Sequence, residues 1–169
     1  MTITKTTLPK ESILNVGHKK YDFVDSFRGV LNDDKDSFST VDIGKAFFSS
    51  GPKWVGKLFA LRNGIASFLG LKTAGNKGDI QKHLENFSCE PGEQLGLFKV
   101  FDKSENEIIL GEDDKHLNFR VSLFVEHVQS SELKKELTIT TTVVFNNCLN
   151  YFPPFSYWFP DNFVGFGHA

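Results

Sequence analysis

The chain has 169 residues, a formal net charge of −2 and a hydrophobic fraction of 40%, as expected of one domain that needs neither disulfides nor a metal to fold. The near-neutral charge argues against a nucleic-acid-binding protein, because such proteins usually carry a basic face. Cys89 and Cys148 stand outside any CxxC motif, so we expect reduced thiols and a cytoplasmic location. We expect no secretory signal, and no apolar run approaches the about 20 residues that span a bilayer.

The N-terminal part of the chain predicts an arm followed by a strand. Residues 1–19 are polar and weakly patterned, so we expect an extended lead-in before a single domain over residues 20–169. Residues 21–27 alternate between apolar and polar side chains, which predicts a half-buried strand. One face of this strand carries Tyr21, Phe23 and Phe27, with Asp25 between them.

Two helices are predicted in the next part of the chain. Ser39 or Thr40 can cap the first, which runs to Phe48. Gly51-Pro52 opens the second and longer helix, because proline suits the first helical turn. Apolar residues then recur at spacings of three and four, and form one stripe of an amphipathic helix: Trp54, Leu58, Leu61, Ile65 and Phe68. We expect this stripe to be buried against a sheet.

The period of the pattern changes to two after Leu95, and two hairpins are predicted. The first joins residues 95–101 to 107–111, and the second joins 116–128 to 134–146. In the second hairpin one strand has the apolar face Leu117, Phe119, Val121, Leu123 and Val125. The opposite face includes Arg120 and, on the partner strand, Thr138, Thr140 and Thr142. This is typical of an antiparallel meander with one face on a core and one wetter face.

Four segments carry a family resemblance: LRN at 61–63 within the long helix, EQLGLF at 93–98, EIILGEDDKHLNFRVSL at 107–123 and TITTTVVFNN at 138–147. In these segments the chain resembles a bacterial domain-of-unknown-function family, the 2867 type, of the START-like, polyketide-cyclase-like helix-grip superfamily. The resemblance covers roughly residues 20–155. It implies a curved antiparallel sheet that grips a long C-terminal helix, often with a cavity between them, and it implies no established activity.

The C-terminal end departs from that family. Residues 151–166 hold eight aromatic side chains and the prolines Pro153, Pro154 and Pro160, which oppose a long helix. Two interpretations of this tail stay open: a lid that packs on the sheet, or an apolar patch that favours self-association. We therefore predict an α+β, helix-grip fold of five to seven antiparallel strands around one long helix, with an atypical C-terminal end.

The main polar group contains Asp113, Asp114, His116 and Arg120. In a functional interpretation it is an acid–base pair with an arginine that recognises an anion. In the structural interpretation, which we favour, the aspartates accept backbone hydrogen bonds in a turn and Arg120 forms a cross-strand ion pair. Arg62 could hold a ligand carboxylate, or extend its side chain to solvent. The five histidines form no HxH or HxxxH pair, so we expect no metal and no cofactor.

The leading hypothesis is a non-enzymatic carrier or sensor that binds a small apolar ligand in a cavity between sheet and helix. Its expected ligand-binding residues are Phe59, Arg62, Leu117, Phe119, Arg120 and Val121. A rival is a cyclase- or hydrolase-like enzyme that uses His116 with Asp113 or Asp114. A third is a structural or interaction module that forms a homo-oligomer through an edge strand or the aromatic tail. A polar cluster inside the cavity favours the enzyme, and one on the outer face favours the carrier.

Overall fold

The computed structural model describes residues 3–17, 20–32, 38–49, 84–95, 98–115, 117–128 and 131–146. These residues include a seven-stranded sheet, the α-helix α1 and one short 3-10 helix, and Leu84 and Glu85 are also helical. All strand pairs in the sheet are antiparallel. The described part of the chain therefore has the α+β character that the sequence predicts, with a strand number inside the expected range.

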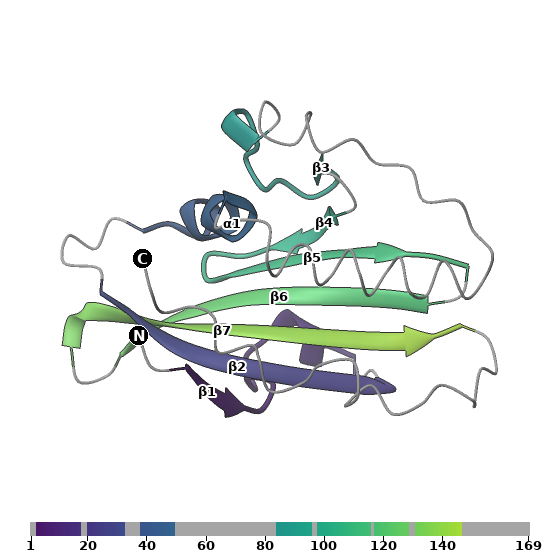
Figure 1. Ribbon diagram of the computed structural model, residues 1–169, viewed down its shortest axis with the longest axis horizontal. Helices are drawn as coiled ribbons and strands as arrows, with labels where there is room; N and C mark the ends of the chain where they lie inside the picture. Colours follow the sequence, from purple (N-terminus) through teal and green to yellow (C-terminus); the bar gives the residue numbers. More distant parts are fainter. Residues whose placement is uncertain are drawn as a thin grey trace.

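The sheet has the order β1-β2-β7-β6-β5-β4-β3 (Figure 1). Its strands are β1 (Ile3–Thr6), β2 (Phe23–Asn32), β3 (Gln94–Leu95), β4 (Phe98–Lys103), β5 (Glu107–Asp113), β6 (Leu117–Val128) and β7 (Ser131–Phe145). The strands β3 to β7 form a meander in chain order. The early strand β2 joins that meander by pairing with β7, the last strand.

Both predicted hairpins are confirmed, as β4–β5 and β6–β7. The strand predicted at residues 21–27 is also confirmed, although it begins at Phe23 and extends to Asn32. The N-terminal lead-in contains more structure than its polar sequence suggests. β1 pairs with β2 at the edge of the sheet, and the 3-10 helix η1 (Ile13–Asn15) follows it.

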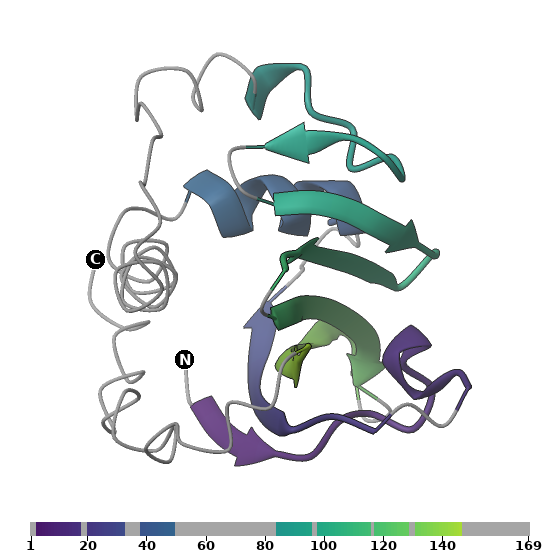
Figure 2. The ribbon, with the colours of Figure 1, turned by 90° about the vertical axis from the view of Figure 1, so that its right-hand side faces the viewer.

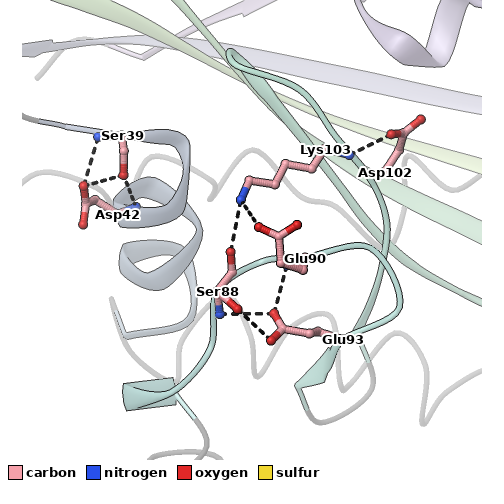
Figure 3. Close-up of polar contacts among 7 residues, drawn as sticks. All are labelled: Ser39, Asp42, Ser88, Glu90, Glu93, Asp102 and Lys103. Carbon is pink, nitrogen blue, oxygen red and sulfur yellow. Dashed lines mark hydrogen bonds and ion pairs between the residues drawn. The ribbon is translucent and has the colours of Figure 1, made fainter.

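The helix α1 (Thr40–Ser49) confirms the first predicted helix. Its N-terminus is closed by reciprocal contacts between Ser39 and Asp42 (Figure 3). Asp42 accepts from the Ser39 backbone N–H at 3.0 Å, and the Ser39 hydroxyl oxygen accepts from the Asp42 N–H at 3.2 Å. The side-chain hydrogen bond from Ser39 lowers the pKa of Asp42. These bonds satisfy donors that a helix start leaves free.

The two faces of the sheet carry different elements (Figures 1 and 2). The helix α1 packs on β5 and β6 on one face, which we call the helix face. The opposite face, which η1 covers, we call the outer face. The helix face holds the apolar core, which includes Val100, Ile108, Leu110, Val121 and Leu123, each at most 1% exposed. This confirms the predicted apolar face of residues 117–125.

Several predictions fall outside the described residues. They concern the long helix with Trp54, Leu58, Leu61 and Ile65, the side chains Phe59 and Arg62, and the aromatic tail from Tyr151. The position of a gripping helix therefore stays a prediction from the sequence.

Candidate functional site

Part of the outer face is polar and buried, which corrects the expectation of a wetter face there. Ser122, Thr138 and Thr140 are each 0% exposed, and Ser26 and Thr142 are 1% exposed. The N-terminal segment contributes to this burial, because the Ser12 hydroxyl donates to Glu107 on this face, and Ser12 and Leu14 are themselves buried. Alternation along the strands predicted which residues share a face, but not that the chain's own N-terminus covers it.

Glu107 is the centre of the polar contacts on the outer face, and it is 1% exposed. Its Oε1 accepts from the Ser12 hydroxyl at 2.5 Å and also from the Ser122 hydroxyl. Its Oε2 accepts from the Ile13 backbone N–H at 2.6 Å. Three donors from two distant parts of the chain therefore meet one carboxyl group, as the burial of such a group requires. The sequence signal for Glu107 is weak: one acid before the apolar run of residues 108–110.

Next to Glu107, one buried hydroxyl pair is satisfied and one hydroxyl is not. The Ser26 and Thr140 hydroxyl oxygens lie 2.9 Å apart in a hydrogen bond across β2 and β7. The Thr138 hydroxyl, two residues before Thr140 on β7, is buried without a hydrogen-bond partner. Thr138 and Thr140 lie on the same face and are equally buried. Only the Thr140 hydroxyl, however, makes a hydrogen bond that contributes to stability.

Arg120 lies flat across the outer face toward β4. Its Cζ lies 3.4 Å from the centroid of the Phe101 ring, and its Nη2 lies 2.7 Å from Asp113 Oδ1. Its Nη1 donates to the carbonyl oxygens of Phe119 at 2.8 Å and Glu112 at 3.3 Å. Gly111 permits this path, because a Cβ there would collide with the Phe119 carbonyl oxygen and lie 3.0 Å from Arg120 Cδ.

Tyr21 contacts the N-terminal segment and lies near the charges of Arg120 and Glu107. It precedes β2, and its hydroxyl donates to the Leu14 carbonyl oxygen at 2.6 Å. Burial raises the pKa of Tyr21; the nearby Arg120 charge opposes that shift and the Glu107 charge adds to it. Tyr21 thus belongs to the outer-face contacts and does not extend the row of Phe23 and Phe27 that the sequence predicted.

The structure brings together only part of the predicted polar group. Asp113 and Arg120 form the cross-strand ion pair of the structural interpretation. Asp114 is exposed in the following turn, where its backbone N–H donates to the Leu117 carbonyl oxygen at 2.9 Å. His116 lies outside the described residues.

The expected ligand-binding residues are divided between the two faces. Val121 belongs to the core of the helix face, and Phe119 packs against that core with an edge-to-face contact to Phe98. Leu117, partly buried, shares their strand. Arg120 lies on the outer face, so the sheet separates it from Phe119 and Val121. Phe59 and Arg62 lie outside the described residues.

The helix face has a polar end at β2 that interrupts its apolar rows. Residues paired directly across antiparallel strands share a face, and Asp25 pairs with Thr141, which pairs with Val121 of the core. Asp25 therefore lies on the helix face. Its side chain is 13% exposed and its Oδ1 is buried without a hydrogen-bond partner, although Lys5 Nζ lies 3.0 Å from it in an ion pair. The sequence signal was visible: one acid between Phe23 and Phe27.

A second cluster of polar contacts stabilises the loop before β3 (Figure 3). Glu93 accepts from the Ser88 and Glu90 backbone N–H groups at 3.1 and 2.9 Å, and Lys103 Nζ lies 2.7 Å from Glu90 Oε1. This loop holds Cys89, a free and fully buried thiol, against Gly44 of α1. The carboxylates of Glu90 and Glu93 are held by the loop itself and by Lys103 of β4, so we assign this cluster a structural role.

The described residues contain no group of three His, Cys, Asp or Glu side chains that could hold a metal ion. None of the helices described is long and apolar enough to cross a bilayer.

A comparison with protein families gives one result. A family model with the description "Protein of unknown function (DUF2867)" matches residues 18–152. The match spans well over half of the chain, so the chain belongs to the DUF2867 family, as the quoted segments predicted. The comparison with curated proteins and the comparison with solved structures each found no match.

Proposed function

We propose that this DUF2867 chain is a non-enzymatic binding protein for a small apolar ligand, built on a helix-grip fold of the START-like kind. The observation that carries the proposal is the division of the two faces by the sheet. The ion pair of Arg120 and Asp113 lies on the outer face, opposite α1 and the apolar core. A polar cluster on the outer face is what a carrier predicts, whereas a cyclase- or hydrolase-like enzyme needs that cluster beside the apolar site.

The contacts of Arg120 give independent support. Asp113, Phe101 and two carbonyl oxygens surround its guanidinium group. Asp113 is half exposed and already neutralised by this arginine. The acid and the arginine of the predicted polar group are therefore partners of each other within the protein.

The helix face offers a surface for an apolar molecule. Several of its apolar side chains on β2, β6 and β7 are only partly buried, although Val143 of β7 is 2% exposed. The partly buried set packs against the core and includes Leu31, Phe119, Leu137 and Ile139. We place the ligand at the end of the helix face that lies toward β2 and β7. The residues of the long predicted helix, including Phe59 and Arg62, would cover it in a helix-grip arrangement.

The bacterial origin and the cytoplasmic location are part of the same proposal. The family resemblance supports the first. The free buried thiol of Cys89 is compatible with the second, since reducing compartments keep thiols unpaired.

A fluorescent naphthalene probe tests the binding function. We expect saturable binding to the folded protein that a heat-unfolded sample does not show. Ile139→Arg, on the helix face, should weaken binding at least tenfold, which corresponds to about 1.4 kcal/mol. Val24→Arg is the matched control, because Val24 lies on the other face of β2 and is 44% exposed. Both variants must melt cooperatively. Non-saturable binding, or equal loss in the two variants, contradicts the proposal.

A further inference from the structure

We infer that Asp25 recognises the polar head group of the ligand through a hydrogen bond. The ligand is then a small apolar molecule with one hydrogen-bond donor, a hydroxyl or an amine. This inference rests on the proposed function and names its ligand class. It follows from the position of the Asp25 carboxylate on the helix face, and from the absence of a hydrogen bond to its Oδ1.

The position follows from the strand register. The row Asp25, Thr141, Val121, Leu110, Val100 crosses the sheet from β2 to β4 through directly paired residues. Val121, Leu110 and Val100 form the core, with exposures of at most 1%. The row therefore changes from apolar and buried to polar at the end where the ligand is proposed to lie. Thr141 places a hydroxyl beside the carboxylate.

The neighbours of Asp25 along β2, and the residues that pair with them on β7, are apolar on the helix face. Phe27 pairs with Ile139, and Phe23 pairs with Val143, so aromatic and aliphatic side chains flank the carboxylate on both sides. Phe119 pairs with Val143 and extends that apolar surface onto β6. An apolar molecule on this surface would thus meet a small polar group, made of the Asp25 carboxylate with Thr141 and Lys5 beside it. Binding sites often use a few placed polar atoms in this way to orient a ligand.

The carboxylate itself is incompletely satisfied. Asp25 Oδ1 is buried and accepts no hydrogen bond. Lys5 Nζ lies 3.0 Å away but outside hydrogen-bond geometry, and the Lys5 side chain is 74% exposed. A long and solvated lysine is a weak partner. A buried acceptor that has an ion pair but no hydrogen bond is incompletely satisfied, and a donor on the ligand would supply that bond.

The same geometry disfavours an anionic head group. A carboxylate or phosphate beside Asp25 would add a second negative charge at short distance, in surroundings that screen charge poorly. Lys5 could attract an anion, but its ammonium group already lies at the carboxylate. The negative charge of Asp25 therefore favours a head group that donates a hydrogen bond over one that only accepts.

Competition against the naphthalene probe tests this inference. We compare 1-decanol, decylamine and decanoate, which share an apolar chain and differ in head group. In the parent protein, decanol and decylamine should displace the probe at concentrations about tenfold lower than decanoate, as expected for one hydrogen bond to a charged group. Asp25→Asn and Asp25→Leu should reduce this preference to within about twofold while probe binding persists.

Two control variants test whether the head-group preference depends on Asp25 itself or on a neighbouring charge. Asp22→Asn changes a nearby exposed carboxylate that accepts from the Phe145 N–H, and it should keep the preference. Lys5→Ala should keep the preference as well.

Loss of stability in Asp25→Leu with an unchanged preference would show that the ion pair of Asp25 is purely structural, and would overturn the inference. Tighter binding of decanoate that Lys5→Ala removes would also overturn it. Saturable probe binding without any head-group preference refutes this inference alone, whereas absence of saturable binding refutes the proposed function too.

Discussion

Ser12 and Glu107 lie 95 residues apart in the chain, and the Ser12 hydroxyl donates to the Glu107 carboxylate with 2.5 Å between Oγ and Oε1. The next backbone N–H, that of Ile13, donates to the other oxygen. This pair of contacts fixes the N-terminal segment to the outer face, where both side chains are 1% exposed. The N-terminal residues are therefore part of the folded unit and not a separate arm.

Replacement of Glu107 by leucine should destabilise the protein by roughly 3 kcal/mol or more, because three donors then lose their acceptor in a buried place. Glu107→Gln should cost less, since one oxygen remains. Denaturant unfolding measures both changes, and Glu105→Gln, in the exposed turn before β5, is the control. Hydrogen exchange should also show faster exchange of the Ile13 amide in Glu107→Leu. A stability equal to that of the parent would contradict the assignment of Glu107 as the anchor.

Thr138 and Thr140 provide a matched pair of substitutions on β7. Thr140→Val should cost about 1–2 kcal/mol, because it leaves the Ser26 hydroxyl buried without its partner. Thr138→Val should be neutral or slightly stabilising, because the lost hydroxyl has no hydrogen-bond partner. Both residues are 0% exposed, and valine has nearly the same shape as threonine. Chemical denaturation of the two variants gives the comparison, and equal losses would show that the Thr138 hydroxyl is satisfied in solution.

Local pattern was sufficient to predict much of the sheet. Alternation places Phe119, Val121 and Leu123 on the core face, and the structure confirms it. The cap formed by Ser39 and Asp42 was also readable, because a helix start is decided by residues three positions apart. A cross-strand ion pair of Arg120 was also predicted, and the structure identifies its partner as Asp113.

Long-range contacts were not predictable from the same pattern. Nothing near Glu107 in the sequence indicates that Ser12 and Ile13 meet it, so the outer face was expected to be wetter than it is. β1 was missed because a four-residue edge strand with alternating threonines has little apolar signal. Asp25 was noted, but its lack of a hydrogen-bond partner depends on β1 and β7, which lie far from it in the chain.

Arg120→Ala should lower stability by about 1–2 kcal/mol, because it removes the stacking on Phe101 and two bonds to carbonyl oxygens. Asp113→Asn should cost under about 1 kcal/mol, since an ion pair with a half-exposed acid contributes little. Arg120→Lys should behave like the alanine variant, because a lysine cannot reproduce the flat guanidinium contacts.

None of these changes should alter affinity for the naphthalene probe, because Arg120 lies on the outer face. His116→Ala belongs in the same series. Thermal melting and probe titration are run on each variant beside the parent. If Arg120→Ala and His116→Ala both melt like the parent while probe affinity falls more than tenfold, about 1.4 kcal/mol, the polar group belongs to the ligand site and its structural interpretation is wrong.

Cys89 should make stability fall at alkaline pH. Burial raises the pKa of its thiol from 9.0 to about 11, so the folded protein holds the proton over a range in which the unfolded chain releases it. Well below pH 9 both states are protonated, and the group has no effect on the pH dependence. Between pH 9 and 11 the unfolded state is increasingly favoured, by about 2 kcal/mol at pH 10.5.

Cys89→Ala removes this contribution and keeps Tyr21, whose raised pKa acts in the same direction. Urea unfolding at pH 8 and pH 10.5 should therefore show a larger loss for the parent than for Cys89→Ala. Equal losses would mean that the thiol is not buried as the structure places it.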